Sequence, residues 1–141
     1  MDSCRTHVRE QHGCRVVNEA EPITVTCVQY SRSDYRQDWI VKANGHWYHI
    51  CAWRVEGTMG CGPMFIVVRE CCSEDNAAPG IHGKLVVHTA TNRWRWSGPM
   101  PTVATTAADV IRQGLCVKVP GSVLFRLAAD GCDIEITFRL L

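Results

Sequence analysis

The beginning of the chain carries the residue types that bind zinc. The side chains with ligand chemistry are Cys4, His7, His12 and Cys14. Structural zinc takes four thiolates or imidazole nitrogens in a tetrahedron, so these residues predict a zinc site that pins the N-terminal segment. In an alternative form of this zinc site, Cys71, Cys72 or His82 supplies one of the ligands. The spacing is tighter than in common zinc fingers, so a free arm, a Cys4–Cys14 disulfide and separate contacts with the core stay open.

A second combination of cysteine and histidine lies in the segment HWYHICAW. Side chains alternate along a strand, so His46 and His49 point to opposite faces. One hypothesis is a cysteine–histidine hydrolase with Cys51 or Cys116 as nucleophile. Its general base would be His46 or His88. A reactive thiolate needs partial exposure, normally beside a histidine or at a helix N-terminus, and neither cysteine has a helix N-terminus behind it in the predicted elements. Buried thiols and histidines are therefore favoured, and the hydrolase stays as an alternative.

The segment RWRW is a candidate binding strand. Its residues are Arg93, Trp94, Arg95 and Trp96. If the two indoles face outward, they form a stacking platform for single-stranded RNA or DNA, a sugar or an apolar side chain. If they face inward, the exposed Arg93 and Arg95 can hold a phosphate or a carboxylate. A strand with two different faces normally buries its indoles, so the second arrangement is favoured.

The composition is that of an ordinary globular chain of 141 residues with a net charge of +1. This charge creates no global attraction for nucleic acid or an anionic membrane. No apolar run approaches the roughly 18 residues of a membrane helix. The nine cysteines are odd in number and scattered, which favours free thiols in a reducing compartment, the cytoplasm or nucleus. A mature secreted protein is the alternative.

The pattern along the chain predicts mostly strands. Residues 1–22 are expected to form an N-terminal arm. Expected strands cover 23–30, 38–43, 46–54, 64–71, 84–90, 93–97, 115–119, 123–128 and 132–141. Asn44-Gly45 is a strong hairpin signal, and Pro120-Gly121 is expected to join the two strands that flank it. One short helix is expected over 106–113, with Thr105 or Thr106 as N-cap and Gly114 as its end.

About eight short strands and one short helix predict a mainly β fold. The expected architecture is a single-domain antiparallel β-sandwich or barrel over residues 23–141, with residues 1–22 as an N-terminal arm that the zinc site, if present, holds in place. The residue types include no paired catalytic carboxylates, phosphate-binding loop or dinucleotide-binding motif.

The leading functional interpretation is a non-enzymatic protein-binding or assembly module. Its partner would be another protein or a second copy of the chain, because five tryptophans supply the aromatic anchors common at interfaces. A small chain rich in arginine and cysteine also suits a viral accessory or capsid-associated protein, or a pathogen effector. The hydrolase and the single-stranded nucleic-acid binder are the two alternatives.

Overall fold

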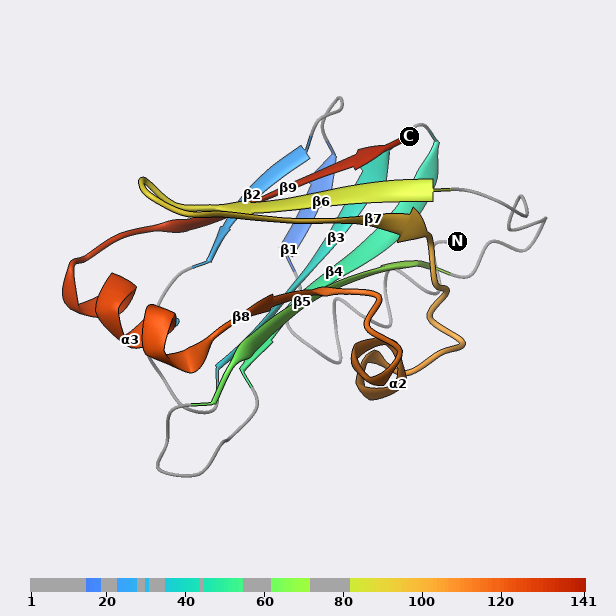
Figure 1. The fold of residues 1–141 in the computed structure, drawn as a ribbon. Coiled ribbons are helices and arrows are strands. Elements are labelled where there is room, and N and C mark those ends of the chain that lie inside the picture. Colours follow the sequence, from blue (N-terminus) through green and yellow to red (C-terminus); the bar gives the residue numbers. More distant parts are fainter. Residues whose placement is uncertain are drawn as a thin grey trace.

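The computed structural model describes residues 15–18, 23–27, 30, 35–43, 45–54, 62–71 and 82–141, with the backbone alone described for 15–18. These residues form two β-sheets that pack face to face around one core (Figure 1). The predicted β-sandwich is therefore confirmed. Within the described ranges the two sheets stay separate and do not close into a barrel.

One sheet has five strands in the order β1-β3-β4-β5-β8. They are β1 (Arg15–Asn18), β3 (Arg36–Ala43), β4 (His46–Arg54), β5 (Met64–Glu70) and β8 (Val117–Val119). β1 runs parallel to β3, and the other neighbours are antiparallel. β1 lies within the segment predicted as an arm, and the boundary of the domain at residue 23 stays a prediction. The hairpin between β3 and β4 turns at Gly45, whose φ of 81° suits glycine.

The other sheet has four antiparallel strands in the order β2-β9-β6-β7. They are β2 (Ile23–Cys27), β9 (Ile134–Leu140), β6 (His82–His88) and β7 (Arg93–Pro99). Apolar and polar residues alternate along these strands, so one face of the sheet is buried and the other meets solvent. This alternation confirms the two-faced strands predicted within 23–30 and 132–141, which the structure places at Ile23–Cys27 and Ile134–Leu140.

The core lies between the two sheets. Phe138 of β9 and Tyr48 of β4 meet there, with ring centroids 5.0 Å apart, and both are fully buried. The five-stranded sheet is buried on its other face as well, since seven of the nine residues of β4 are buried. β5 is likewise buried on both faces, and it lies between β4 and β8.

The predicted short helix is α2 (Ala107–Arg112). The Thr106 hydroxyl accepts a hydrogen bond from the backbone N–H of Asp109, which satisfies one free donor of the first turn. Gly114, which was predicted to end the helix, follows it with a φ of 76°. This left-handed conformation is the one that glycine commonly adopts after a helix. The predicted helix, its N-cap and its end are therefore confirmed.

The strand predicted over 123–128 is wrong, because these residues belong to the helix α3 (Gly121–Ala129). Pro120 precedes the helix in an extended conformation, and Gly131 follows it with a φ of 69°. Leu124 and Leu127, three residues apart, turn the same helical face into the core. The Pro120-Gly121 pair was interpreted as a turn between strands, although such a pair also suits the beginning of a helix.

The two helices lie at opposite ends of the sandwich. α2 lies beside β5, whereas α3 lies at the end that also holds the β6–β7 turn (Figure 1). Neither these nor any other helix in the described ranges has the length and apolar character needed to span a membrane.

Candidate functional site

The four-stranded sheet turns one face away from the core, and we call this the outer face. Alternate residues of its last three strands form the face. They are Glu135, Thr137 and Arg139 of β9, Lys84, Val86 and His88 of β6, and Arg93, Arg95 and Ser97 of β7. The antiparallel register places Arg139 opposite Lys84, and His88 opposite both Glu135 and Arg93. Residues far apart in the sequence therefore share one surface.

The outer face is predominantly basic. Its cationic side chains are Lys84, Arg93, Arg95 and Arg139, and its one carboxylate is that of Glu135. Glu135 Oε2 lies 3.7 Å from His88 Nε2. Within the described part of the chain, no carboxylate lies within ion-pair distance of the four cations. These four charges are consequently available to an external partner.

The two indoles of β7 lie on the core side of the sheet. Trp94 and Trp96 are partly buried and pack against the hydrophobic core, whereas Arg93 and Arg95 are exposed. This is the arrangement that the sequence favoured. It removes the outward stacking platform on which the nucleic-acid hypothesis depends, and it leaves the two guanidiniums as the accessible groups.

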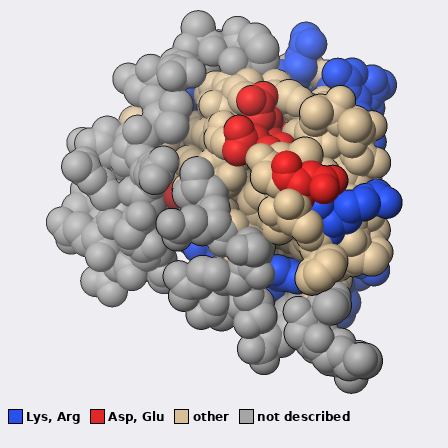
Figure 2. Space-filling model, turned by 90° about the vertical axis from the view of Figure 1, so that its left-hand side faces the viewer, with Lys and Arg blue, Asp and Glu red and all other residues tan. Residues whose placement is uncertain are grey.

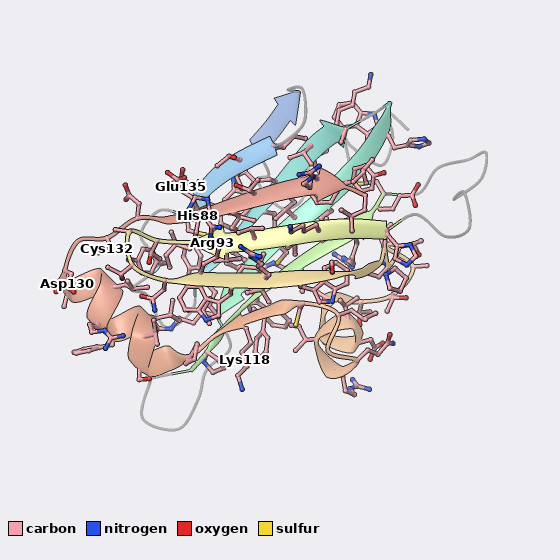
Figure 3. The ribbon with its side chains drawn as sticks, turned by 45° about the horizontal axis from the view of Figure 1, so that its top comes forward. His88, Arg93, Lys118, Asp130, Cys132 and Glu135 are labelled. Atoms are coloured by element: carbon pink, nitrogen blue, oxygen red, sulfur yellow. The ribbon has the colours of Figure 1, made fainter. Side chains whose placement is uncertain are left out.

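A pocket of about 340 Å³ opens at one end of the outer face. Its lining residues are His88, Thr89, Ala90, Cys132, Asp133 and Glu135. They come from the end of β6, the β6–β7 turn and the start of β9, close to α3 (Figure 3). The pocket therefore combines two carboxylates, a hydroxyl, a thiol and an imidazole at the α3 end of the sandwich.

The face of the five-stranded sheet that points away from the core holds a buried polar chain. Asp38 Oδ1 lies 2.7 Å from His49 Nε2, and Arg69 Nη2 lies 2.8 Å from His49 Nδ1. Arg69 also donates a hydrogen bond to the carbonyl of Thr105, and Arg36 donates to Asp38. Asp38, His49 and Arg69 are 6%, 4% and 9% exposed. β3, β4 and β5 each contribute one of these three residues. The hydrogen-bonded series therefore connects the three strands beneath the protein surface.

The hydrogen-bond pattern fixes the protonation of His49. A guanidinium only donates, so Nδ1 of His49 accepts from Arg69 and Nε2 carries the proton that goes to Asp38. Burial lowers the pKa of His49, and the charges of Arg69 and Arg36 add to this effect against the attraction of Asp38. The neutral imidazole already uses both ring nitrogens. It has no free nitrogen for the general-base role of a hydrolase.

The structure does not place Cys51 in a catalytic arrangement with His46 or His88. Cys51 is fully buried, and burial next to Asp38 raises its pKa to about 12. His46 is on the opposite face of β4, where its Nδ1 lies 4.0 Å from Glu70 Oε1. His88 contacts Glu135 and Thr137. A nucleophilic thiolate needs exposure and a lowered pKa, and Cys51 has neither.

These environments predict which thiols react with iodoacetamide in the folded protein. Cys132 and Cys116 are partly exposed, whereas Cys27, Cys51 and Cys71 are buried. Burial also raises the pKa of Cys27 to about 12. We expect the three buried thiols to react at least about tenfold more slowly, because the thiolate is the reactive species. Peptide mapping by mass spectrometry after short exposures measures the order, and a fast reaction at Cys51 would instead favour the hydrolase.

The four predicted zinc ligands lie outside the described residues. Cys4, His7, His12 and Cys14 belong to residues 1–14, so the zinc site stays a prediction. In the ranges that the structure describes, no group of three or more histidine, cysteine, aspartate or glutamate side chains is arranged to hold a metal ion.

Sequence reasoning identified Arg93 and Arg95 but missed Lys84 and Arg139. The alternation of β6 and β9 places each of these two on the polar side of its strand. Only the strand order shows that both are on the same sheet as β7. The Asp38–His49–Arg69 chain was missed for the same reason, because its three members are paired by register and not by spacing.

No protein-family model matches the chain, and comparison with curated proteins finds no relative. The residues and their geometry are therefore the basis for a functional conclusion.

Proposed function

We propose that the chain is a non-enzymatic module that binds another protein through the outer face of its four-stranded sheet. The observation that carries this proposal is the set of four cations on three adjacent strands, without described carboxylates beside them. The part of the partner that meets this face is acidic. Glu135 limits the basic area at the end nearest the pocket.

The strength expected of this surface follows from its exposure. Arg93, Arg95 and Arg139 are exposed and Lys84 is half-buried. An exposed ion pair contributes about 0.2–1 kcal/mol, so the four cations together support weak to moderate binding. Arginine adds directional bidentate contacts with carboxylates, which gives orientation as well as attraction. The charges should mainly accelerate association and select the partner, while uncharged contacts supply the remaining affinity.

A protein partner fits this face better than a nucleic acid. Trp94 and Trp96 are on the core side and offer no outward stacking surface. Glu135 and the nearby Asp133 would repel a continuous phosphate backbone. A protein surface carries charges of both signs, and so it can match a basic face that ends at two carboxylates.

The same proposal places the module in a reducing compartment, the cytoplasm or nucleus. Support comes from the five cysteines in the described ranges, which are all free thiols. Oxidising compartments favour paired cysteines in small domains.

The test uses an oligoglutamate peptide and an oligouridylate of equal charge as probes, measured by fluorescence anisotropy at low salt. We expect the peptide to bind, and the double substitution Arg93→Ser, Arg95→Ser to weaken it by about tenfold, because two exposed ion pairs are lost. Salt should weaken the binding further, since exposed charges are screened.

The matched control is Arg112→Ser with Lys118→Ser, which removes the same charge from exposed positions on α2 and β8. It should leave the affinity for oligoglutamate within about twofold of the parent, because only long-range attraction changes. Equal loss in both double variants would contradict a specific face. Tighter binding of oligouridylate than of oligoglutamate would favour the nucleic-acid alternative.

A further inference from the structure

A second surface lies at the end of the sandwich where α3 meets the β6–β7 turn. Phe125 projects from α3 with 69% of its surface exposed, and its neighbour Arg126 is also exposed. Leu124 and Leu127 hold the opposite side of the helix in the core. The helix therefore presents an aromatic ring and a guanidinium to solvent from a fixed position. Phenylalanine and arginine are both common anchors at protein interfaces.

The same end of the sandwich also has a pocket that suits an aromatic ring next to a guanidinium. The pocket of about 340 Å³ between β6, β9 and the β6–β7 turn includes the uncharged Ala90 and Cys132 next to the carboxylates of Asp133 and Glu135. Figure 2 looks onto this end and shows acidic groups among uncharged side chains, with basic side chains toward the margin. The Phe125 ring and the pocket both lie at the α3 end of the sandwich. Phe125 is not among the residues that line the pocket of its own chain.

We propose that the chain forms a twofold-symmetric dimer through this end. Phe125 of each copy enters the pocket of the second copy, and Arg126 of each copy pairs with Asp133 and Glu135 of the second copy. The proposal goes beyond the binding of a partner to the outer face, because it adds the α3 end, which shares only His88 and Glu135 with that face, and identifies its occupant.

Charge and symmetry favour a second copy as that occupant. The pocket carries the carboxylates of Asp133 and Glu135, and α3 presents the guanidinium of Arg126 beside Phe125, so these groups attract each other between copies. The net charge of the chain is +1, so two copies repel each other little as whole molecules. Phe125 and the pocket lie at the same end of the chain. A single twofold axis therefore forms both Phe125–pocket contacts, and neither copy keeps a free site for a third copy. An anchor and a pocket at opposite ends would instead produce an open filament.

Sedimentation velocity over a range of protein concentrations tests the dimer. We expect a monomer–dimer equilibrium in the parent chain. Phe125→Ser should raise its dissociation constant at least about a hundredfold, because two aromatic anchors are lost per dimer. The matched control is Leu141→Ser, since Leu141 is the other large apolar side chain exposed in the described ranges, at 68%. This control should leave the equilibrium unchanged.

Charge exchange tests the contact between Arg126 and the pocket. Arg126→Glu alone and Asp133→Lys alone should each weaken the dimer, and the two together should restore it, because the pair is re-formed with reversed signs. A parent chain that stays monomeric at every concentration would overturn the proposal, as would equal effects of Phe125→Ser and Leu141→Ser. A series of species larger than the dimer would overturn its twofold closure.

The two proposals fail in distinguishable ways. Loss of oligoglutamate binding in Arg93→Ser, Arg95→Ser with an unchanged dimer supports the outer face independently. Loss of the dimer in Phe125→Ser with unchanged oligoglutamate binding supports the α3 end independently.

Discussion

Replacing Asp38 by alanine is expected to lower the free energy of unfolding by about 3 kcal/mol. Asp38 accepts hydrogen bonds from His49 and Arg36 in a site where its side chain is 5% exposed. Without the carboxylate, the guanidinium of Arg69 is left in the same buried chain with no carboxylate of the described residues paired to it. Urea unfolding at neutral pH measures the difference. A matched control is Asp130→Ala, an exposed carboxylate at the end of α3, which should change stability by less than about 0.5 kcal/mol.

The effect of Asp38→Ala should depend on pH. Burial by itself raises the pKa of Asp38, but the hydrogen bond from His49 and the charge of Arg36 outweigh it, so the pKa is lowered overall. A carboxylate with a lowered pKa stabilises the folded chain above its unfolded pKa, about 4, and loses this contribution as the pH falls through the folded value. The difference between parent and variant should therefore be complete at pH 7 and shrink in acid. A loss below about 1 kcal/mol at pH 7 would contradict a structural role for the chain.

Replacing Phe138 by alanine is expected to lower the free energy of unfolding by about 4 kcal/mol. The ring is fully buried between the two sheets and packs against Tyr48. Its removal loses apolar burial and leaves a cavity that the surrounding strands cannot close. Thermal and urea unfolding both measure the loss.

The neighbouring residue supplies the control for Phe138. Arg139 follows it on β9 and points to the opposite, solvated face. Arg139→Ala should change stability by less than about 0.5 kcal/mol while weakening the binding of oligoglutamate. Similar destabilisation by the two substitutions would mean that β9 does not separate a core side from a binding side.

The two-faced strands were predictable because alternation is a local signal. Ile23 and Val25 against Thr24, and Ile134 and Ile136 against Glu135, identify the buried face without knowledge of the partner strand. The helix α2 was predictable for a similar reason, since its cap and its terminal glycine are adjacent to it in sequence.

The helix α3 was not predicted because its signals conflict. Residues 123–128 begin with Val-Leu-Phe and lie between two turn-forming pairs, which suits a strand as well as a helix. The deciding feature is tertiary, since Leu124 and Leu127 both reach the core only when the segment is helical.

The candidate site was predictable in part. Arg93 and Arg95 could be identified from one strand, but Lys84 and Arg139 joined them only through the order of strands in the sheet. The Asp38–His49–Arg69 chain likewise depends on the pairing of β3, β4 and β5. Strand order is a long-range property, and sequence spacing does not determine it.

The central claim is that the outer face of the four-stranded sheet binds an acidic protein surface. Its most direct test is the affinity for oligoglutamate of the variant Arg93→Ser, Arg95→Ser, compared with that of Arg112→Ser, Lys118→Ser. We predict about a tenfold loss in the first variant and near-parent affinity in the second, because only the first removes charges from the face. Equal affinities in the two variants would contradict the claim.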